Sequence, residues 1–128
     1  MDTSKLRYTE SHEWVSLNGK TARVGITDHA QKEISDVVFV ELPKAGKKVN
    51  QKDSVMVVES VKAAFDIYAP LSGNVLKAND KLTMKPELVN QSPFEEGWLY
   101  ELEVSDASQF EKLLTETQYK GVAGKAAH

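Results

Sequence analysis

Two runs of residues that favour extended backbone, 55–58 and 65–68, lie close together with small or polar residues between them. β-Branched and aromatic residues are typical of strands, and a short interval between two such runs predicts an antiparallel hairpin with Lys62 at its tip. A solvated lysine is a poor Schiff-base or general-base group, because those roles need a pKa lowered by burial. The tip is instead open to an enzyme that acylates the lysine nitrogen, although ordinary surface lysines are also common in exposed turns.

The composition indicates one domain over residues 1–128, with a core at about 6–120 and 41% hydrophobic and 27% charged residues. A net charge of -3 with scattered basic residues argues against a nucleic-acid partner. Without a long apolar run or a recognisable signal or transit peptide, we expect a cytoplasmic protein with no membrane partner. The chain has no cysteine, so any redox chemistry would have to belong to an attached group.

The first structured stretch is predicted to be a hairpin, with strands at 8–15 and 21–26 and a turn at Asn18-Gly19. On a strand through residues 8–15, Ser11 and Glu13 share one face because they are two residues apart.

His12, Glu13 and Trp14 suggest a catalytic or metal site. Neighbours on a strand point to opposite faces, and no second histidine stands at ligand spacing, so no metal site is predicted. The alternative is that Trp14 packs in the core while His12 and Glu13 are surface groups.

A short helix follows, capped by Asp28 with Gln31 at the third helical position and ending near Ile34 or Ser35. Further strands are expected at 37–42, 73–76 and 98–104, with one helical turn at 86–89.

The chain is then expected to turn helical, with Asp106 as the cap, Gln109 three residues on, and Gly121 at the end. The apolar stripe of this helix comprises Phe110, Leu113 and Leu114. Residues 121–128 are predicted to be a frayed tail.

Residues 59–63, followed by 66–70 and 72–73, resemble the lipoyl-lysine hairpin of the glycine cleavage system H-protein family. The resemblance continues through short strings in the same order at 11–14, 24–27, 29–31, 38–43, 86–90 and 97–98. It implies a mainly β fold, a barrel-sandwich hybrid of the lipoyl/biotinyl-carrier type with short peripheral helices and a C-terminal helix.

The resemblance also implies a function in glycine catabolism and one-carbon metabolism. Lipoic acid would be joined by an amide to Lys62, and the arm would shuttle the aminomethyl group of glycine. The implied partners are a pyridoxal-phosphate glycine decarboxylase, a tetrahydrofolate-dependent aminomethyltransferase, an FAD- and NAD-dependent dihydrolipoyl dehydrogenase, and a lipoate ligase or lipoyl/octanoyl transferase. Because the chemistry belongs to the cofactor and the partners, the chain is expected to be a carrier and not an enzyme.

By the same resemblance, the loaded arm docks in a cleft formed by Ser11, Glu13 and Asp66. Phe65 stands where a small or polar residue is expected, and its ring could cover or block that cleft. The modifying enzyme is expected to recognise the tip through Glu59 and Ala63.

Two alternatives remain open at this point. One is a lipoyl carrier, or a lipoate-donating hub, that serves another pathway. The other is an unmodified β interaction domain that keeps the hairpin without the cofactor.

Overall fold

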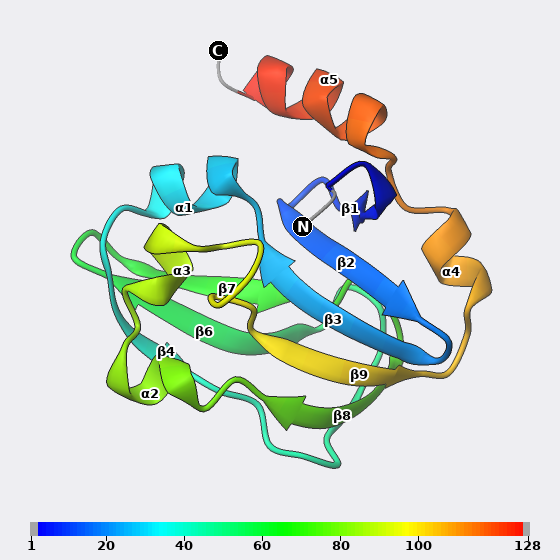
Figure 1. Cartoon of the computed structure of the whole chain (residues 1–128), viewed down its shortest axis with the longest axis horizontal. Helices are drawn as coiled ribbons and strands as arrows, with labels where there is room; N and C mark the ends of the chain where they lie inside the picture. The colour runs from blue at the N-terminus through cyan, green and yellow to red at the C-terminus, as the bar shows by residue number, and fades with distance from the viewer. Residues whose placement is uncertain (1–2, 127–128) are drawn as a thin grey trace.

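The computed structural model describes residues 3–126, which form two antiparallel sheets with short helices around them (Figure 1). The six-stranded sheet has the order β1-β2-β3-β9-β8-β5, and the three-stranded sheet has the order β4-β6-β7. In sheet order, the strands are β1 (Arg7–Tyr8), β2 (Glu13–Asn18), β3 (Thr21–Ile26), β9 (Tyr100–Val104), β8 (Gly73–Ala78) and β5 (Lys48–Val49), then β4 (Val37–Glu41), β6 (Ser54–Ser60) and β7 (Ala64–Tyr68). The mainly β prediction is confirmed.

Short helices lie around the two sheets (Figure 1). They are the 3-10 helix η1 (Thr3–Lys5) and the α-helices α1 (Asp28–Ile34), α2 (Lys81–Met84), α3 (Leu88–Gln91), α4 (Ser108–Glu111) and α5 (Glu116–Ala126). Within the part of the chain that the structure describes, no helix is long and apolar enough to cross a bilayer.

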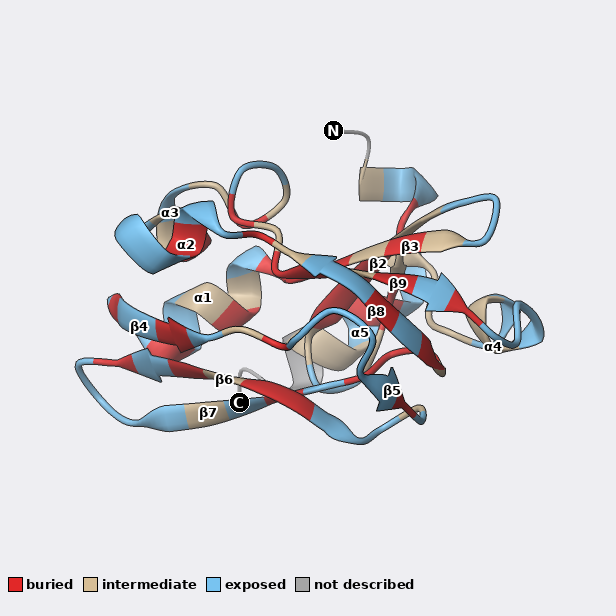
Figure 2. Cartoon of the chain, turned by 90° about the horizontal axis from the view of Figure 1, so that it is seen from below, coloured by how far each residue is buried: buried red, intermediate tan, exposed pale blue. Residues whose placement is uncertain are grey.

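The core lies between the two layers, where the buried faces of the sheets meet (Figure 2). Val24 and Leu102 come from the larger sheet and Val58 and Ile67 from the smaller one, and all four are buried in one apolar cluster. Burying a side chain of this size contributes about 1.5–3 kcal/mol, so the lysine hairpin is anchored by its own strands.

The hairpin predicted around Lys62 is confirmed, since β6 and β7 pair with Val58 opposite Phe65 and Glu59 opposite Ala64. The strand predicted at 37–42 is found as β4, and that at 73–76 as the first part of β8. The last strand begins at Tyr100, two residues later than predicted.

The strand predicted at 8–15 is wrong, because β1 ends at Tyr8 and β2 begins at Glu13. Between them the chain makes a tight turn in which His12 adopts a φ of 71°. The Thr9 hydroxyl accepts a hydrogen bond from the backbone N–H of Glu13 at 3.0 Å. Such local side-chain bonds compete with a continuous strand. At the next turn, Asn18 is still a strand residue, and Gly19 turns the chain with a φ of 63°.

The N-cap of α1 is Thr27 and not Asp28, because the Thr27 hydroxyl accepts from the backbone N–H of Ala30 at 3.2 Å. The Asp28 carboxylate instead accepts from the side chain of Gln31 at 2.8 Å. The predicted end of this helix is confirmed at Ile34. Further along, α2 was not predicted, and α3 begins at Leu88, two residues after the expected start.

The single C-terminal helix predicted from Asp106 to Gly121 is wrong. Helix α4 ends at Glu111, and Leu114 then pairs with Tyr8 through two backbone hydrogen bonds of 2.8 and 2.9 Å. Phe110, Leu113 and Leu114 therefore do not form one helical face.

The predicted cap is found in part. The Asp106 carboxylate accepts from the backbone N–H of Ser108, the first residue of α4, at 3.0 Å. Gln109 does not complete a capping box, because its side chain donates to Ser72. Helix α5 continues through Gly121 to Ala126, so the frayed tail is wrong for 121–126, and 127–128 lie outside the described residues.

Candidate functional site

The turn that carries Lys62 is fixed by the side chain of Ser60. The Ser60 hydroxyl oxygen accepts from the backbone N–H groups of Lys62, at 3.1 Å, and of Ala63, at 3.3 Å. The backbone N–H of Ser60 donates to the carbonyl of Ala63 at 2.9 Å, which closes the turn. Ser60 is buried, whereas residues 61–63 are exposed. The tip is thus a fixed support for an accessible lysine.

The hairpin tip rests on the end of α1. The backbone N–H of Val61 donates to the carbonyl of Asp36 at 3.0 Å, and Lys62 Nζ lies 3.5 Å from the carbonyl oxygen of Glu33. A cation is favoured beside the carbonyls that end a helix. The contact of Lys62 is long, however, and leaves its ammonium exposed.

Apolar side chains are exposed next to the lysine. Val61 is 69% exposed, and on the neighbouring strand β4 Val38 is 55% and Phe39 52% exposed. Phe39 is paired with Glu59, so this strand reaches the base of the tip. An apolar surface beside a reactive group is typical of a protein contact site.

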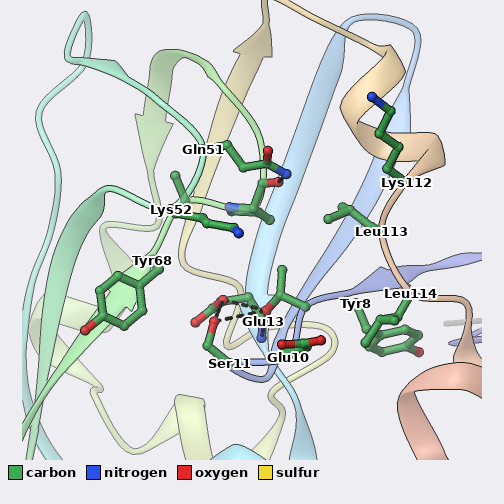
Figure 3. A pocket seen from close by; sticks show the side chains of 13 residues that line it. Tyr8, Glu10, Ser11, Glu13, Gln51, Lys52, Tyr68, Lys112, Leu113 and Leu114 are labelled. Carbon is green, nitrogen blue, oxygen red and sulfur yellow. Dashed lines mark hydrogen bonds between the residues drawn. The ribbon is translucent and has the colours of Figure 1, made fainter. Parts of the chain in front are cut away.

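A cavity of about 540 Å³ lies where the turn after β1 meets the end of β7 and the segment before α5 (Figure 3). It is lined by Tyr8, Thr9, Glu10, Ser11, Glu13, Gln51, Lys52, Tyr68, Ala69, Pro70, Lys112, Leu113 and Leu114. The cavity is therefore built from four segments that are far apart in the sequence, at residues 8–13, 51–52, 68–70 and 112–114.

Glu13 is the buried acid of this cavity, since the residue is only 2% exposed. Its Oε1 accepts from the hydroxyls of Thr9 and Ser11, both at 2.6 Å. Dashed lines in Figure 3 mark hydrogen bonds beside Glu13 and Ser11. Burial raises the pKa of Glu13, and the two hydroxyls and the backbone of Tyr68 oppose that rise. The alternative that Glu13 is a surface group is wrong.

The structure brings together two of the three residues expected in the cleft. Ser11 and Glu13 meet through a hydrogen bond made in a turn, not through strand alternation as predicted. Asp66 does not line the cavity; it is exposed on β7 and accepts from the Ser54 hydroxyl at 2.8 Å. It shares a strand face with Tyr68, two residues on, which does line the cavity.

Phe65 does not line the cavity either. Its ring is half-buried and packs against the core, on the opposite face of β7 from Asp66. Glu59 and Ala63, the expected recognition residues, are both exposed at the tip.

Lys52, Tyr68 and Lys112 line the cavity but were not predicted. No local pattern points to them, because their segments meet only in the fold. Thr9 is different, since a hydroxyl residue four positions before Glu13, with Ser11 between them, could have indicated a carboxylate held by side-chain donors.

A two-sheet fold that presents an exposed lysine at the tip of a fixed hairpin is that of a carrier domain. The chain matches the family described as glycine cleavage H-protein over residues 6–125, and it belongs to this family. It is 51% identical over 114 residues to a glycine cleavage system H protein of Thermotoga maritima, covering 89% of this chain and 92% of that protein.

Two more relatives agree with this assignment. A probable glycine cleavage system H protein of Aeropyrum pernix is 54% identical over 114 residues, covering 89% of this chain and 80% of that protein. The crystal structure of a glycine cleavage system H protein from Mycobacterium marinum superposes with a TM-score of 0.86 at 34% identity, covering 94% of this chain and 98% of that chain. The protein is thus the lipoyl carrier of the glycine cleavage system, a carrier component and not an enzyme.

Proposed function

We propose that Lys62 is the residue to which the lipoyl group is attached. The observation that carries this assignment is the turn itself, in which Ser60 fixes the backbone of Lys62 while the lysine side chain stays exposed. A ligase needs such an accessible amine, and a swinging arm needs a fixed point of attachment.

The surroundings of Lys62 fit an amide as well as an amine. Acylation removes the charge of Nζ, and the contact it would weaken is one 3.5 Å approach to the carbonyl of Glu33. The amide nitrogen keeps one N–H, which can still donate to that carbonyl. When attached, the lipoyl group would supply a disulfide that accepts an aminomethyl group.

The extended arm is long enough to follow β7 as far as Asp66. From the Cα of lysine to the dithiolane ring it spans about 12–14 Å when extended. Asp66 lies four residues from Lys62, which is about 13 Å along a strand at about 3.3 Å per residue. The end of the arm would therefore reach Asp66, and Tyr68, at the edge of the cavity that holds Glu13, lies about 7 Å further along the strand.

Glu13, Ser11 and Asp66 are proposed to receive the amine at the end of the arm. A primary ammonium is bound well by a carboxylate that is already held in place and shielded from water. Glu13 meets both conditions, since it is buried and held by two hydroxyls. The cavity would also limit the access of water to the bound group.

Partners within the glycine cleavage system would approach at the lysine tip. We assign the decarboxylase, the aminomethyltransferase, the dihydrolipoyl dehydrogenase and the lipoate-attaching enzyme to this surface. Val38, Phe39 and Val61 offer each of them the same apolar contact beside Lys62. The enzyme that attaches lipoate would recognise Glu59 and Ala63, which are exposed at the tip.

The test is the exchange of labelled bicarbonate into glycine, with a glycine decarboxylase and the lipoate-treated carrier. Lys62→Arg keeps the charge but cannot form the amide, so we expect its exchange to fall to the level without carrier. Lys44→Arg, at an exposed lysine in the β4–β5 loop, is the matched control and should support exchange like the wild type. Exchange supported by Lys62→Arg would contradict the assignment.

A further inference from the structure

Two histidines and a glutamate meet through side chains that have no part in the proposed carrier role, although the backbone carbonyl of Glu33 lies near Lys62. We propose that His12, His29 and Glu33 form a binding site for a divalent transition-metal ion such as Zn²⁺. The inference does not depend on which lysine carries the lipoyl group.

The three side chains are already close to a ligand arrangement. One donor atom from each lies within 4.8 Å of the other two. His29 Nε2 and Glu33 Oε1 are 3.0 Å apart, and the ring centroids of His12 and His29 are 4.6 Å apart. Ligands of a tetrahedral zinc ion, bound at about 2.0–2.2 Å, lie roughly 3.3 Å from one another. Small side-chain rotations are enough to close the site.

The backbone fixes the two halves of the site relative to each other. His29 and Glu33 are four residues apart on α1, so they lie on one face of the helix. His12 comes from the turn before β2, and its carbonyl accepts from the backbone N–H of Thr27, the cap of α1, at 3.0 Å. The expectation of no second histidine near His12 considered local spacing alone, and the fold brings His29 from another element.

The ring of His12 is oriented by a hydrogen bond from its other nitrogen, as the rings of metal-binding histidines usually are. Its Nδ1 lies 2.8 Å from the hydroxyl of Tyr119, which in turn lies 2.7 Å from the hydroxyl of Thr27. This leaves Nε2 of His12 available for a ligand bond. Tyr119 and Thr27 are both buried, so the supporting pair is held by packing.

The donor set selects the class of ion. Two imidazoles and one carboxylate suit Zn²⁺, Cu²⁺ or Ni²⁺, whereas Mg²⁺ and Ca²⁺ prefer oxygen ligands. The side chain of His29 is 25% exposed and that of Glu33 51%, so an ion can enter from solvent and water can complete its coordination. A bound ion would connect the turn of His12 to α1 and, through Tyr119, to α5.

The experiment is a calorimetric titration of the full, metal-free protein with zinc chloride, with the melting temperature recorded in parallel. We expect one ion per chain and a rise in melting temperature, because an ion that binds only the folded state stabilises it. His29→Gln, His12→Asn and Glu33→Gln should each weaken binding at least tenfold. Asparagine is chosen at His12 because it tolerates the positive φ of that position.

Two variants serve as matched controls. His128→Gln removes a histidine outside the described residues, and Asp28→Asn removes the acid of another i, i+4 pair on α1, with Lys32. Both should bind zinc as the wild type does, and circular dichroism of the metal-free variants checks that each is folded. Tyr119→Phe, which removes only the orienting hydroxyl, should weaken binding by about tenfold.

Three results would overturn the proposal: no saturable binding by the folded wild type, unchanged affinity in the ligand variants, or an equal loss in Asp28→Asn and Glu33→Gln. An equal loss in these two variants would show that zinc binds through the general negative charge of α1 and not through a ligand bond to Glu33. Magnesium chloride should give neither heat nor a shift in melting temperature, and a response equal to that of zinc would contradict a site built on imidazoles.

Discussion

The side-chain oxygen of Ser60 accepts a hydrogen bond from the backbone N–H of Lys62 at 3.1 Å, so the residue that fixes the hairpin tip lies two positions before the lysine it presents. Ser60 is buried and also receives the N–H of Ala63. The hydroxyl of Ser60 therefore adds two hydrogen bonds to the backbone bonds that already close the turn, which matters for any enzyme that must recognise it.

Ser60→Ala is expected to lower the free energy of unfolding by about 1 kcal/mol, since two backbone donors lose their partner. It should also slow lipoylation, because the tip samples other conformations. Ser105→Ala, at an exposed position just after β9, is the control and should change stability by less than about 0.5 kcal/mol. Chemical denaturation and a ligase time course measure both effects; a Ser60→Ala protein lipoylated at the wild-type rate would show that the turn need not be preformed.

Ala63→Trp tests whether the attaching enzyme closes over the tip. Ala63 is exposed next to Lys62, so a bulky ring there should obstruct the enzyme while changing the melting temperature little. Ala45→Trp places the same ring in an exposed turn between β4 and β5 and should leave lipoylation unchanged. Equal initial rates for Ala63→Trp and wild type would argue that the tip is not read locally.

Glu13→Ala and Asp66→Ala test the sheltering of the aminomethyl group at the end of the arm. After loading by the decarboxylase, we expect spontaneous release of formaldehyde and ammonia to be faster in both variants than in the wild type, without the transferase present. The larger increase is expected for Glu13→Ala, because Glu13 lines the cavity and Asp66 only borders the route to it.

Glu103→Ala is the control for that experiment, since Glu103 is an exposed acid on β9 that does not line the cavity. Its loaded form should have the wild-type lifetime. If Glu13→Ala and Asp66→Ala also keep that lifetime while remaining folded, neither residue belongs to the site.

The lysine hairpin could be predicted from the sequence because its signals are local. β-Branched and aromatic residues at 55–58 and 65–68 favour strands, and the small and polar residues between them favour a turn. The start of α1 was misplaced by one residue, since Thr27 and Asp28 are neighbouring residues of capping type and only the geometry distinguishes them.

The features that could not be predicted depend on contacts between distant segments. The C-terminal helix was expected to be continuous, but Leu114 pairs with Tyr8, and this tertiary pairing overrides the helical pattern. The cavity is assembled from four separated segments, and His12 meets His29 only through the placement of α1. Spacing along the sequence predicts neither the cavity nor the meeting of the two histidines.

The most direct test of the central claim is the intact mass of the protein after treatment with lipoate, ATP and a lipoate ligase, followed by peptide mapping. We predict that the wild type and Lys44→Arg each gain the mass of one lipoyl group, that the modified peptide contains Lys62, and that Lys62→Arg gains nothing. A lipoyl group found on any other lysine, or on the Lys62→Arg protein, would contradict the claim that the hairpin tip carries the arm.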